Sequence, residues 1–295
     1  MHRIGRFNPK NVDAEAVELQ TPLDKIVKSG ICNLRVSQYY FDEPLFDEYE
    51  LTTVRATWDF AAAESIVDDG HTIADLGCGD GRLLLHLAEK YRLQNSVGID
   101  ISPVAIDRFQ SCIPPEKRDQ ITAIRGDIFD LSTEISARRF DVVTFGDATV
   151  NFILEEYNLQ RLFESSKNLF RDESSRMLVA VFGDGTPEKL AFMDKRCTVV
   201  PFRQKNGRAA LIWWAYKYDS DKLIMYRSAF AHTDWNEGGD IEGVISDLRD
   251  RMWTPSSIIP LAAKCGLTVD KVVKSIVQDG TAVGMDTAIV IFKSA

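Results

Sequence analysis

One stretch of the sequence has residue types and spacing that suit binding a ligand close to the backbone. Residues 72–82 read Thr-Ile-Ala-Asp-Leu-Gly-Cys-Gly-Asp-Gly-Arg, so that Asp75 is followed by Gly77, Gly79 and Gly81 at every second position. Glycine lets the backbone approach a ligand where a Cβ would collide. The apolar run before the turn predicts a strand, and the apolar residues after it predict a helix. We therefore expect a ligand cradle between a strand and a helix.

The spacing of these glycines decides between two kinds of cradle. A dinucleotide-binding turn needs Gly-x-Gly-x-x-Gly, whose third glycine allows close packing of helix and strand. Gly77 and Gly79 satisfy the first two positions, but the third position is Arg82. The sequence therefore argues against a nicotinamide dinucleotide site.

Acidic residues follow three further predicted strands. Asp100 ends an apolar strand about 20 residues after the glycines, where an acid accepts hydrogen bonds from ribose hydroxyls in doubly wound sheets. Asp127 follows the strand at residues 121–125, and Asp147 follows the strand at residues 140–145. Ligands bind outside the carboxyl ends of the strands in open parallel sheets. We therefore expect these acids and the glycine turn to converge on one crevice.

Alternating strands and helices must position these residues. Helical patterns separate the predicted strands, which indicates βαβ units and a parallel sheet. The strand patterns lie at residues 72–76, 96–101, 121–125, 140–145 and 176–182. The helical patterns lie at residues 22–27, 54–66, 103–109, 159–170 and 254–265. Segments 267–277 and 288–292 are predicted to end the sheet as an antiparallel pair.

The sequence period changes after the fifth strand of this series. The spacing predicts an antiparallel β-meander inserted at residues 198–236, with strands at 199–203, 210–218 and 222–230. Aromatic residues alternate along the middle strand at Trp213, Trp214, Tyr216 and Tyr218. We expect one face of this strand to join the core. The other face is expected to line either a substrate pocket or the interface of a homodimer.

Together these features resemble the S-adenosylmethionine-dependent, Rossmann-like class I methyltransferases. The likeness is to their small-molecule branch, which includes glycine N-methyltransferases and aminosugar N,N-dimethyltransferases. It rests on the pattern Asp-x-Gly-x-Gly-x-Gly from Asp75 to Gly81, the strand-ending acids and the position of the insert. The resemblance implies an α/β fold with a doubly wound, seven-stranded, mostly parallel sheet. It also implies a methyltransferase domain at 53–295, preceded by an N-terminal arm at 1–52 that lies over the active site.

The same resemblance implies S-adenosyl-L-methionine as cofactor and S-adenosyl-L-homocysteine as product. It implies that Asp127 faces the adenine amino group, and that Arg55 either meets the cofactor carboxylate or remains a solvated residue. The implied cofactor-binding residues are Asp75, Gly77, Cys78, Gly79, Asp100, Ile101, Asp127, Ile128, Asp147 and Arg55.

Three residues are candidates for catalytic work on the methyl acceptor. Asp147 is expected beside the transferred methyl group, where it would pair with the substrate amine or with the amino group of the cofactor, or would instead cap the following helix. His232 ends the predicted meander, and a histidine that titrates near neutrality suits a general base, although an isolated histidine is more often structural. Tyr40 lies in an aromatic, acidic segment at 39–49 that is expected either to cover the site or to strap across the domain.

Composition limits the partners. The 295-residue chain has a formal net charge of −9 and no dense basic stripe, which disfavours nucleic acid and anionic membranes. It also lacks the Asn/Asp-Pro-Pro-Tyr/Phe motif typical of nucleic-acid base methylation. No apolar run approaches the ~20 residues of a membrane span, and no secretory pattern opens the sequence. Five scattered cysteines predict free thiols in the cytoplasm, with neither a disulfide framework nor a metal site.

We therefore expect a cytoplasmic enzyme that methylates nitrogen or oxygen of a small polar metabolite, in natural-product biosynthesis for example. Two alternatives stay open at this point. One is a carboxyl or hydroxyl O-methyltransferase of secondary metabolism. The other is a catalytically silent cofactor-binding module that serves as a partner subunit.

Overall fold

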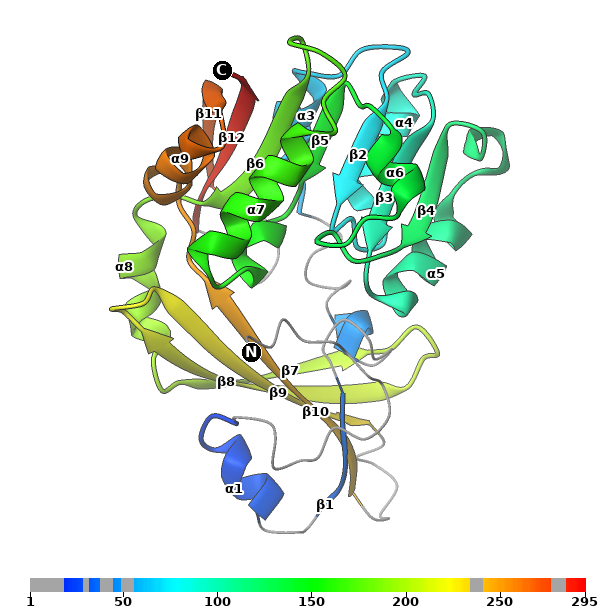
Figure 1. Ribbon diagram of the computed structural model, residues 1–295. Helices are drawn as coiled ribbons and strands as arrows, with labels where there is room; N and C mark the ends of the chain where they lie inside the picture. Colours follow the sequence, from blue (N-terminus) through cyan, green and yellow to red (C-terminus); the bar gives the residue numbers. More distant parts are fainter. Residues whose placement is uncertain (1–18, 29–31, 38–44, 49–55, 234–240, 277–284) are drawn as a thin grey trace. The chain divides into compact units, whose positions relative to one another are not determined.

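The computed structural model describes residues 19–28, 32–37, 45–48, 56–233, 241–276 and 285–295. The chain divides into two compact units (Figure 1). The seven-stranded unit consists of Leu51–Leu190, Ser220–Ile224 and Asp250–Ala295. The five-stranded unit consists of Met1–Glu50, Ala191–Asp219 and Met225–Arg249.

The sheet of the seven-stranded unit confirms the predicted doubly wound architecture. Its order is β11-β12-β6-β5-β2-β3-β4. Strands β4, β3, β2, β5 and β6 run parallel, whereas β12 is antiparallel to both β6 and β11. The chain moves outward from β2 through β3 and β4, then returns to β5 on the other side of β2. Open α/β sheets bind ligands at such a reversal. The strands are β2 (Ile73–Leu76), β3 (Ser96–Asp100), β4 (Ile121–Arg125), β5 (Val142–Phe145), β6 (Arg176–Phe182), β11 (Leu267–Ile276) and β12 (Asp286–Ser294).

Helices cover both faces of this sheet. Consecutive strand residues point to opposite faces, so Val143 packs in the core under α7 and α9, whereas Val142 packs in the core under α4 and α5. Figure 1 shows α7 in front of the sheet and α3 behind it. The helices are α3 (Phe60–Glu64), α4 (Arg82–Lys90), α5 (Pro103–Cys112), η3 (Pro115–Lys117), α6 (Thr133–Ala137), η4 (Thr149–Phe152), α7 (Glu156–Lys167), α8 (Thr186–Leu190) and α9 (Pro255–Lys264).

One predicted helix is much shorter than its pattern. The sequence predicts a helix over 54–66, but among the described residues of this segment only α3 is helical. Residues 54 and 55 lie outside the described part of the chain. The two residues just before α3 are engaged elsewhere: Trp58 donates to a carboxylate in the turn after β5, and Asp59 pairs with Arg82. These contacts hold the segment in a turn, so the prediction of helix there is wrong.

The five-stranded unit contains the predicted meander and two strands that were not predicted. Its sheet has the order β1-β10-β9-β8-β7, with β7 antiparallel to β8 and β1 parallel to β10. β10 and β1 were missed because β10 carries many charged residues and because β1 pairs with a partner more than 200 positions away, as with Cys32 and Ile241. The elements are α1 (Leu23–Lys28), β1 (Cys32–Val36), η5 (Ala191–Met193), β7 (Cys197–Arg203), β8 (Ala209–Asp219), β9 (Ile224–Thr233) and β10 (Ile241–Arg251).

Both faces of β8 are covered by apolar residues. Ile212 and Trp214 pack in one cluster with residues of β9 and β10, and Tyr216 packs against it. Trp213 and Ala215 belong to a second cluster on the other face, with Leu23 of α1 and residues of β9 and β10. The aromatic alternation along β8 therefore supplies core contacts on both sides of the sheet. Within the described residues, no helix is both long and apolar enough to cross a membrane.

Candidate active site at the carboxyl ends of the strands

The glycine turn connects β2 to α4 by close backbone contacts. The amides of Gly77 and Cys78 donate to the Ile99 carbonyl of β3 at 2.7 and 3.1 Å. Gly77 has φ +73°, and a Cβ there would lie 2.3 Å from Thr149 Cγ2. Gly81 has φ +82°, and a Cβ there would lie 2.2 Å from the Phe109 ring of α5. These two positions therefore require glycine for the turn to pack against its neighbours.

Asp100 fixes the glycine turn against the end of β3. Its Oδ2 accepts from the Gly79 amide at 2.9 Å, and its Oδ1 accepts from the Ser102 amide at 2.8 Å. Burial raises the pKa of the Asp100 carboxyl, while the hydrogen bonds from Ser102 and Gly79 oppose that rise. The Ile101 amide also donates to this carboxylate, and because a carboxylate has about four lone-pair sites, it can accept at least one further hydrogen bond. Ile101, which follows, is 37% exposed.

Asp75 lies inside the sheet at the end of β2. It is 2% exposed, and its Oδ1 accepts from Thr144 Oγ1 of β5 at 2.7 Å. Burial raises the pKa of Asp75 to about 7, although the Thr144 hydrogen bond opposes the rise. The sequence does not indicate this degree of burial, since the same Asp-x-Gly pattern fits an exposed acid equally well.

Cys78 turns its side chain away from the ligand edge. The residue is 8% exposed and packs in the core beneath α4 and α5. Burial raises the pKa of its thiol well above the usual range, so the thiol stays protonated and unreactive. Cys78 can therefore contribute only its backbone to a ligand site.

Asp127 and Ile128 shape the loop after β4. Asp127 Oδ1 accepts from the Phe129 amide at 2.9 Å, which forms a tight local turn. Ile128 is partly buried and packs against the core on the α7 face of the sheet. The loop is thus anchored by its own apolar residue, with the Asp127 side chain at the end of β4.

The turn after β5 has unusual backbone geometry. Asp147 has φ +43° and Ala148 has φ +59°, values that residues other than glycine seldom adopt. Thr149 Oγ1 donates to the Gly146 carbonyl at 2.7 Å and to the Gly77 carbonyl at 3.2 Å. This threonine therefore ties the turn after β5 directly to the glycine turn, and Asp147 lies two residues before it.

Asp147 is held by residues that were not predicted from the sequence. Trp58 Nε1 donates to Asp147 Oδ1 at 3.1 Å, and the Asp147 amide donates to Asp59 Oδ2 at 3.0 Å. Asp59 also binds both terminal nitrogens of Arg82, at 2.8 and 2.6 Å. Burial raises the pKa of Asp147, and Arg82 opposes the rise more strongly than the Trp58 hydrogen bond does.

The remaining predicted residues lie elsewhere in the chain. His232 belongs to β9 of the five-stranded unit, where its ring stacks with Phe230 at 6.3 Å between centroids. Burial lowers the pKa of His232. Tyr40 and Arg55 lie outside the described residues, so their predicted roles stay predictions.

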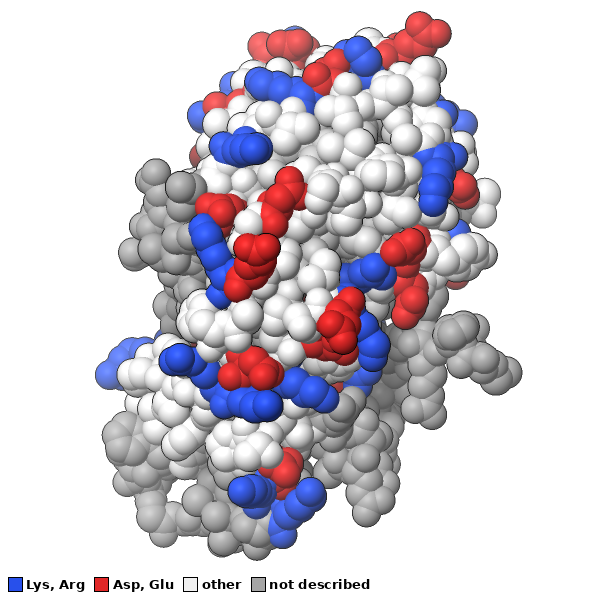
Figure 2. Space-filling view, turned by 90° about the vertical axis from the view of Figure 1, so that its left-hand side faces the viewer, with Lys and Arg blue, Asp and Glu red and all other residues white. Residues whose placement is uncertain are grey.

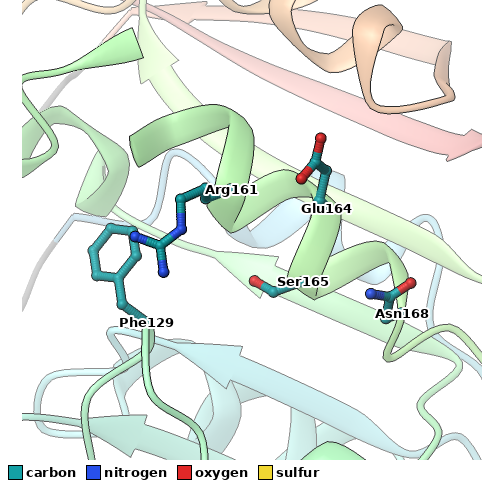
Figure 3. Close-up of a pocket in the computed structure, with 5 residues that line it drawn as sticks. All are labelled: Phe129, Arg161, Glu164, Ser165 and Asn168. Carbon is teal, nitrogen blue, oxygen red and sulfur yellow. The ribbon is translucent and has the colours of Figure 1, made fainter. Parts of the chain in front are cut away.

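A separate shallow pocket lies beside α7. It is lined by Phe129 from the loop after β4 and by four residues of the helix, Arg161, Glu164, Ser165 and Asn168. Figure 3 shows the Arg161 side chain pointing toward Phe129. None of the strand-ending acids lines this pocket, so it is distinct from the candidate site.

Comparison with protein families and curated proteins finds similarity to methyltransferases. The family described as "Methyltransferase domain" matches residues 73–173, a range that includes Asp75, Asp100, Asp127 and Asp147. Two similar curated proteins are N-methyltransferase 4 of Papaver somniferum and (S)-tetrahydroprotoberberine N-methyltransferase of Eschscholzia californica. The first is 27% identical over 57% of this chain and 45% of its own length, and the second is 24% identical over 58% and 47%. The chain thus spans less than half the length of these relatives.

Solved structures share the fold over nearly the whole chain. The CcbJ methyltransferase of Streptomyces caelestis has a TM-score of 0.65 at 16% identity, covering 88% of this chain and 98% of its own. CalS10 of Micromonospora echinaspora, an amino pentose methyltransferase solved with S-adenosylmethionine bound, has a TM-score of 0.55 at 15% identity, covering 93% and 98%. At these identities the likeness establishes the fold.

Proposed function

We propose that the chain uses S-adenosylmethionine to methylate nitrogen of a small polar metabolite. The proposal builds on the match of residues 73–173 to the methyltransferase domain family and on the class I methyltransferase fold. The observation that carries this proposal is the pairing of the glycine turn with Asp100. One carboxylate accepts from both Gly79 and Ser102, so the acid that we assign to the ribose is fixed beside the glycine turn.

The residues present fit this cofactor. The Thr149 methyl group fills the space beside Gly77, so close approach of the cofactor to the backbone is assigned to Gly79, which also lacks a Cβ. The remaining capacity of the Asp100 carboxylate can accept from a ribose hydroxyl. We assign Asp127 to the adenine amino group, and Ile101 and Ile128 to apolar contact with the adenine ring. Cys78 would contribute through its backbone. Arg55 is proposed for the cofactor carboxylate on the family resemblance alone.

Asp75 supports the site from within the sheet. Its carboxyl accepts a hydrogen bond from Thr144, and the residue is buried. We infer that it acts on the cofactor through the conformation of the glycine turn, as a buried group at the end of β2.

When bound, S-adenosylmethionine supplies an electrophilic methyl group that needs little further activation. The contribution of the protein is then to place the acceptor nitrogen in line with that methyl group, which is worth ~7–11 kcal/mol at best. An ammonium acceptor must first lose its proton. We propose Asp147 as the group that orients the amine, and His232 as the base, assisted by Tyr40 at the acceptor. The competing possibility is that water takes the proton and geometry does the rest.

Charge favours a cationic acceptor. The negative charges of Asp80 and Asp59 both raise the pKa of Asp147, and Arg82 is paired with Asp59. An acidic site attracts an ammonium group and a sulfonium group alike. The printed names of the similar curated proteins are those of N-methyltransferases, which supports nitrogen over oxygen.

We also propose a cytoplasmic homodimer with an N-terminal arm at residues 1–52 and a substrate-side insertion at 198–236. The four cysteines with described side chains are free thiols, which supports a reducing compartment.

A transfer assay tests the proposal. The chain is incubated with S-adenosylmethionine labelled in its methyl group and with separate panels of small amines, carboxylic acids and alcohols. Label transferred only to amines, with S-adenosylhomocysteine as product, is the expected result. Transfer only to acids or alcohols would identify an O-methyltransferase. Cofactor binding without transfer to any panel would favour a silent partner subunit.

A further inference from the structure

The turn after β5 has a backbone conformation that its own residues do not favour. Asp147 and Ala148 both have positive φ, and two successive residues other than glycine are seldom found there. Strained backbone of this kind persists only when its surroundings determine it. The contacts of Asp147 therefore show which residues fix the backbone conformation of this turn.

Two consecutive residues hold Asp147 by two different groups. The Asp59 carboxylate accepts from the Asp147 amide at 3.0 Å, and the Trp58 indole donates to the Asp147 carboxylate at 3.1 Å. One short segment thus fixes the backbone of Asp147 and also the direction of its side chain. Gly146 allows this approach, because a Cβ there would lie 3.0 Å from Asp59 Oδ2.

Asp59 is in turn anchored to the glycine turn. It is fully buried, and both its oxygens bind Arg82, which is the first residue of α4 after Gly81. Arg82 also donates to the Ala56 carbonyl at 2.5 Å. A buried ion pair of this geometry is rigid, because separating it would leave a charge without compensation. Asp147 is therefore placed relative to the glycine turn through Asp59 and Arg82.

We propose that Trp58 and Asp59 are positioning residues that set the place and the direction of the Asp147 carboxylate toward the methyl acceptor. This inference rests on the proposed function for the meaning of "acceptor". The arrangement of Trp58, Asp59 and Asp147 can be tested without it. No metal or second ligand is required.

Titration of Asp147 gives a readout that a merely structural role would not move. The charged groups that act on Asp147 are Arg82, Asp59 and Asp80. Trp58→Phe removes a hydrogen bond to the ionised form, so it should move the titration midpoint of Asp147 to higher pH. Asp59→Asn removes a negative charge that raises the pKa of Asp147, so it should move the same midpoint to lower pH.

The experiment uses the full chain with carboxyl-labelled aspartate and follows its ¹³C resonances with pH. The Asp147 resonance is identified by its loss in Asp147→Asn. Asp141→Asn is the matched control, because Asp141 also pairs with an arginine and accepts from a backbone amide, but lies just before β5 at its opposite end. This control should leave the midpoint of Asp147 unchanged. In the unsubstituted chain, the indole N–H resonance of Trp58 should move with pH at that midpoint, and should stop doing so in Asp147→Asn.

Opposite shifts in Trp58→Phe and Asp59→Asn would support the proposal. An Asp147 midpoint that Trp58→Phe leaves in place, or an indole resonance independent of pH, would overturn it. If Asp59→Asn does not fold, Trp58→Phe and the indole resonance decide the matter alone.

Calorimetry with S-adenosylmethionine is run on the same samples. Absence of cofactor binding would reject the proposed function while the titration still decides the role of Trp58 and Asp59.

Discussion

At the scale of single residues, the site contains carboxyl groups that differ in what holds them. Asp75 is buried and bonded to Thr144, Asp100 is fixed by two backbone amides, and Asp147 is bound by an indole and a buried ion pair. Their different environments predict different responses to substitution and to pH.

Asp75→Asn should remove a pH dependence of stability. The folded chain keeps the proton of Asp75 up to about pH 7, whereas the unfolded chain releases it near the ordinary value of 3.8. Unfolding therefore releases a proton between these pH values, and the free energy of unfolding falls as pH rises. Between pH 5 and pH 8 the Asp75 contribution to this loss should be about 2–3 kcal/mol, so the variant should lose about that much less stability than the unsubstituted chain, in which Asp100 and Asp147 also have raised pKa values. Urea unfolding at both pH values measures it, and equal losses in the two proteins would contradict the burial of Asp75.

Asp100→Ala should weaken cofactor binding. The loss of a charged acceptor for ribose hydroxyls is worth about 1.5–3 kcal/mol, which is roughly a 10- to 150-fold rise in Kd. Titration calorimetry with S-adenosylmethionine measures the change. Asp130→Ala serves as control, since Asp130 is exposed in the loop after β4. An unchanged Kd in Asp100→Ala would show that this acid does not bind the cofactor.

The sequence located these acids because each lies at the end of an apolar strand or within two residues after it, and a strand with the residues at its end is a local pattern. It could not locate Trp58 and Asp59 as partners of Asp147, because that contact joins positions about 90 apart and leaves no local pattern. In the sequence, Arg82 is distinguished only as the residue that breaks the dinucleotide pattern. Its structural role as the partner of Asp59 depends on the fold.

At the scale of elements, the glycine turn and the turn after β5 fit together as one assembly. Thr149 donates to the carbonyls of Gly77 and Gly146, and its methyl group fills the space that a Cβ at Gly77 would need. The two strand ends are therefore coupled by one side chain.

This coupling predicts a pair of substitutions that compensate. Gly77→Ala should destabilise the chain by about 1–3 kcal/mol through overpacking, with added backbone strain at positive φ. Thr149→Ser deletes the clashing methyl group and keeps the hydroxyl, so the double variant should recover about 1 kcal/mol or more relative to additivity. Chemical unfolding of the three variants measures this term. Gly207→Ala is the control, because a Cβ at Gly207 meets open space, and its effect should simply add to that of Thr149→Ser.

Strands were predicted well where apolar residues form continuous runs, as in β2, β3, β5 and β6. β10 carries charged residues around buried ones such as Leu248, and β1 pairs with it across more than 200 positions. Neither has a strong local pattern, and their pairing is fixed only when distant segments meet. The helix predicted at 54–66 is short for the opposite reason, since side-chain contacts of Trp58 and Asp59 override a regular apolar pattern.

At the scale of the whole molecule, the distribution of charged side chains bears on the class of ligand. Figure 2 shows Lys and Arg interspersed with Asp and Glu over the described residues of the face in view. This distribution, with the net charge of −9, is consistent with a small-molecule ligand rather than a polyanion.

Trp214→Ala should separate the stability of the five-stranded unit from cofactor binding. Trp214 is 5% exposed in the core of that unit, so its truncation should cost about 3–5 kcal/mol. The glycine turn, Asp100 and Asp127 all belong to the seven-stranded unit. We therefore expect the Kd for S-adenosylmethionine to stay within about twofold of that of the unsubstituted chain. Lys217→Ala, at an exposed position of the same strand, is the control for stability. A large loss of cofactor affinity at a temperature where the variant is folded would contradict this division of roles.

The most direct test of the central claim is calorimetric titration of the chain with S-adenosylmethionine and, separately, with NAD. The glycine turn followed by Arg82, with Asp100 fixed beside it, predicts that S-adenosylmethionine binds in the low-micromolar range or tighter and that NAD gives no binding heat. Binding of NAD without binding of S-adenosylmethionine would contradict the account.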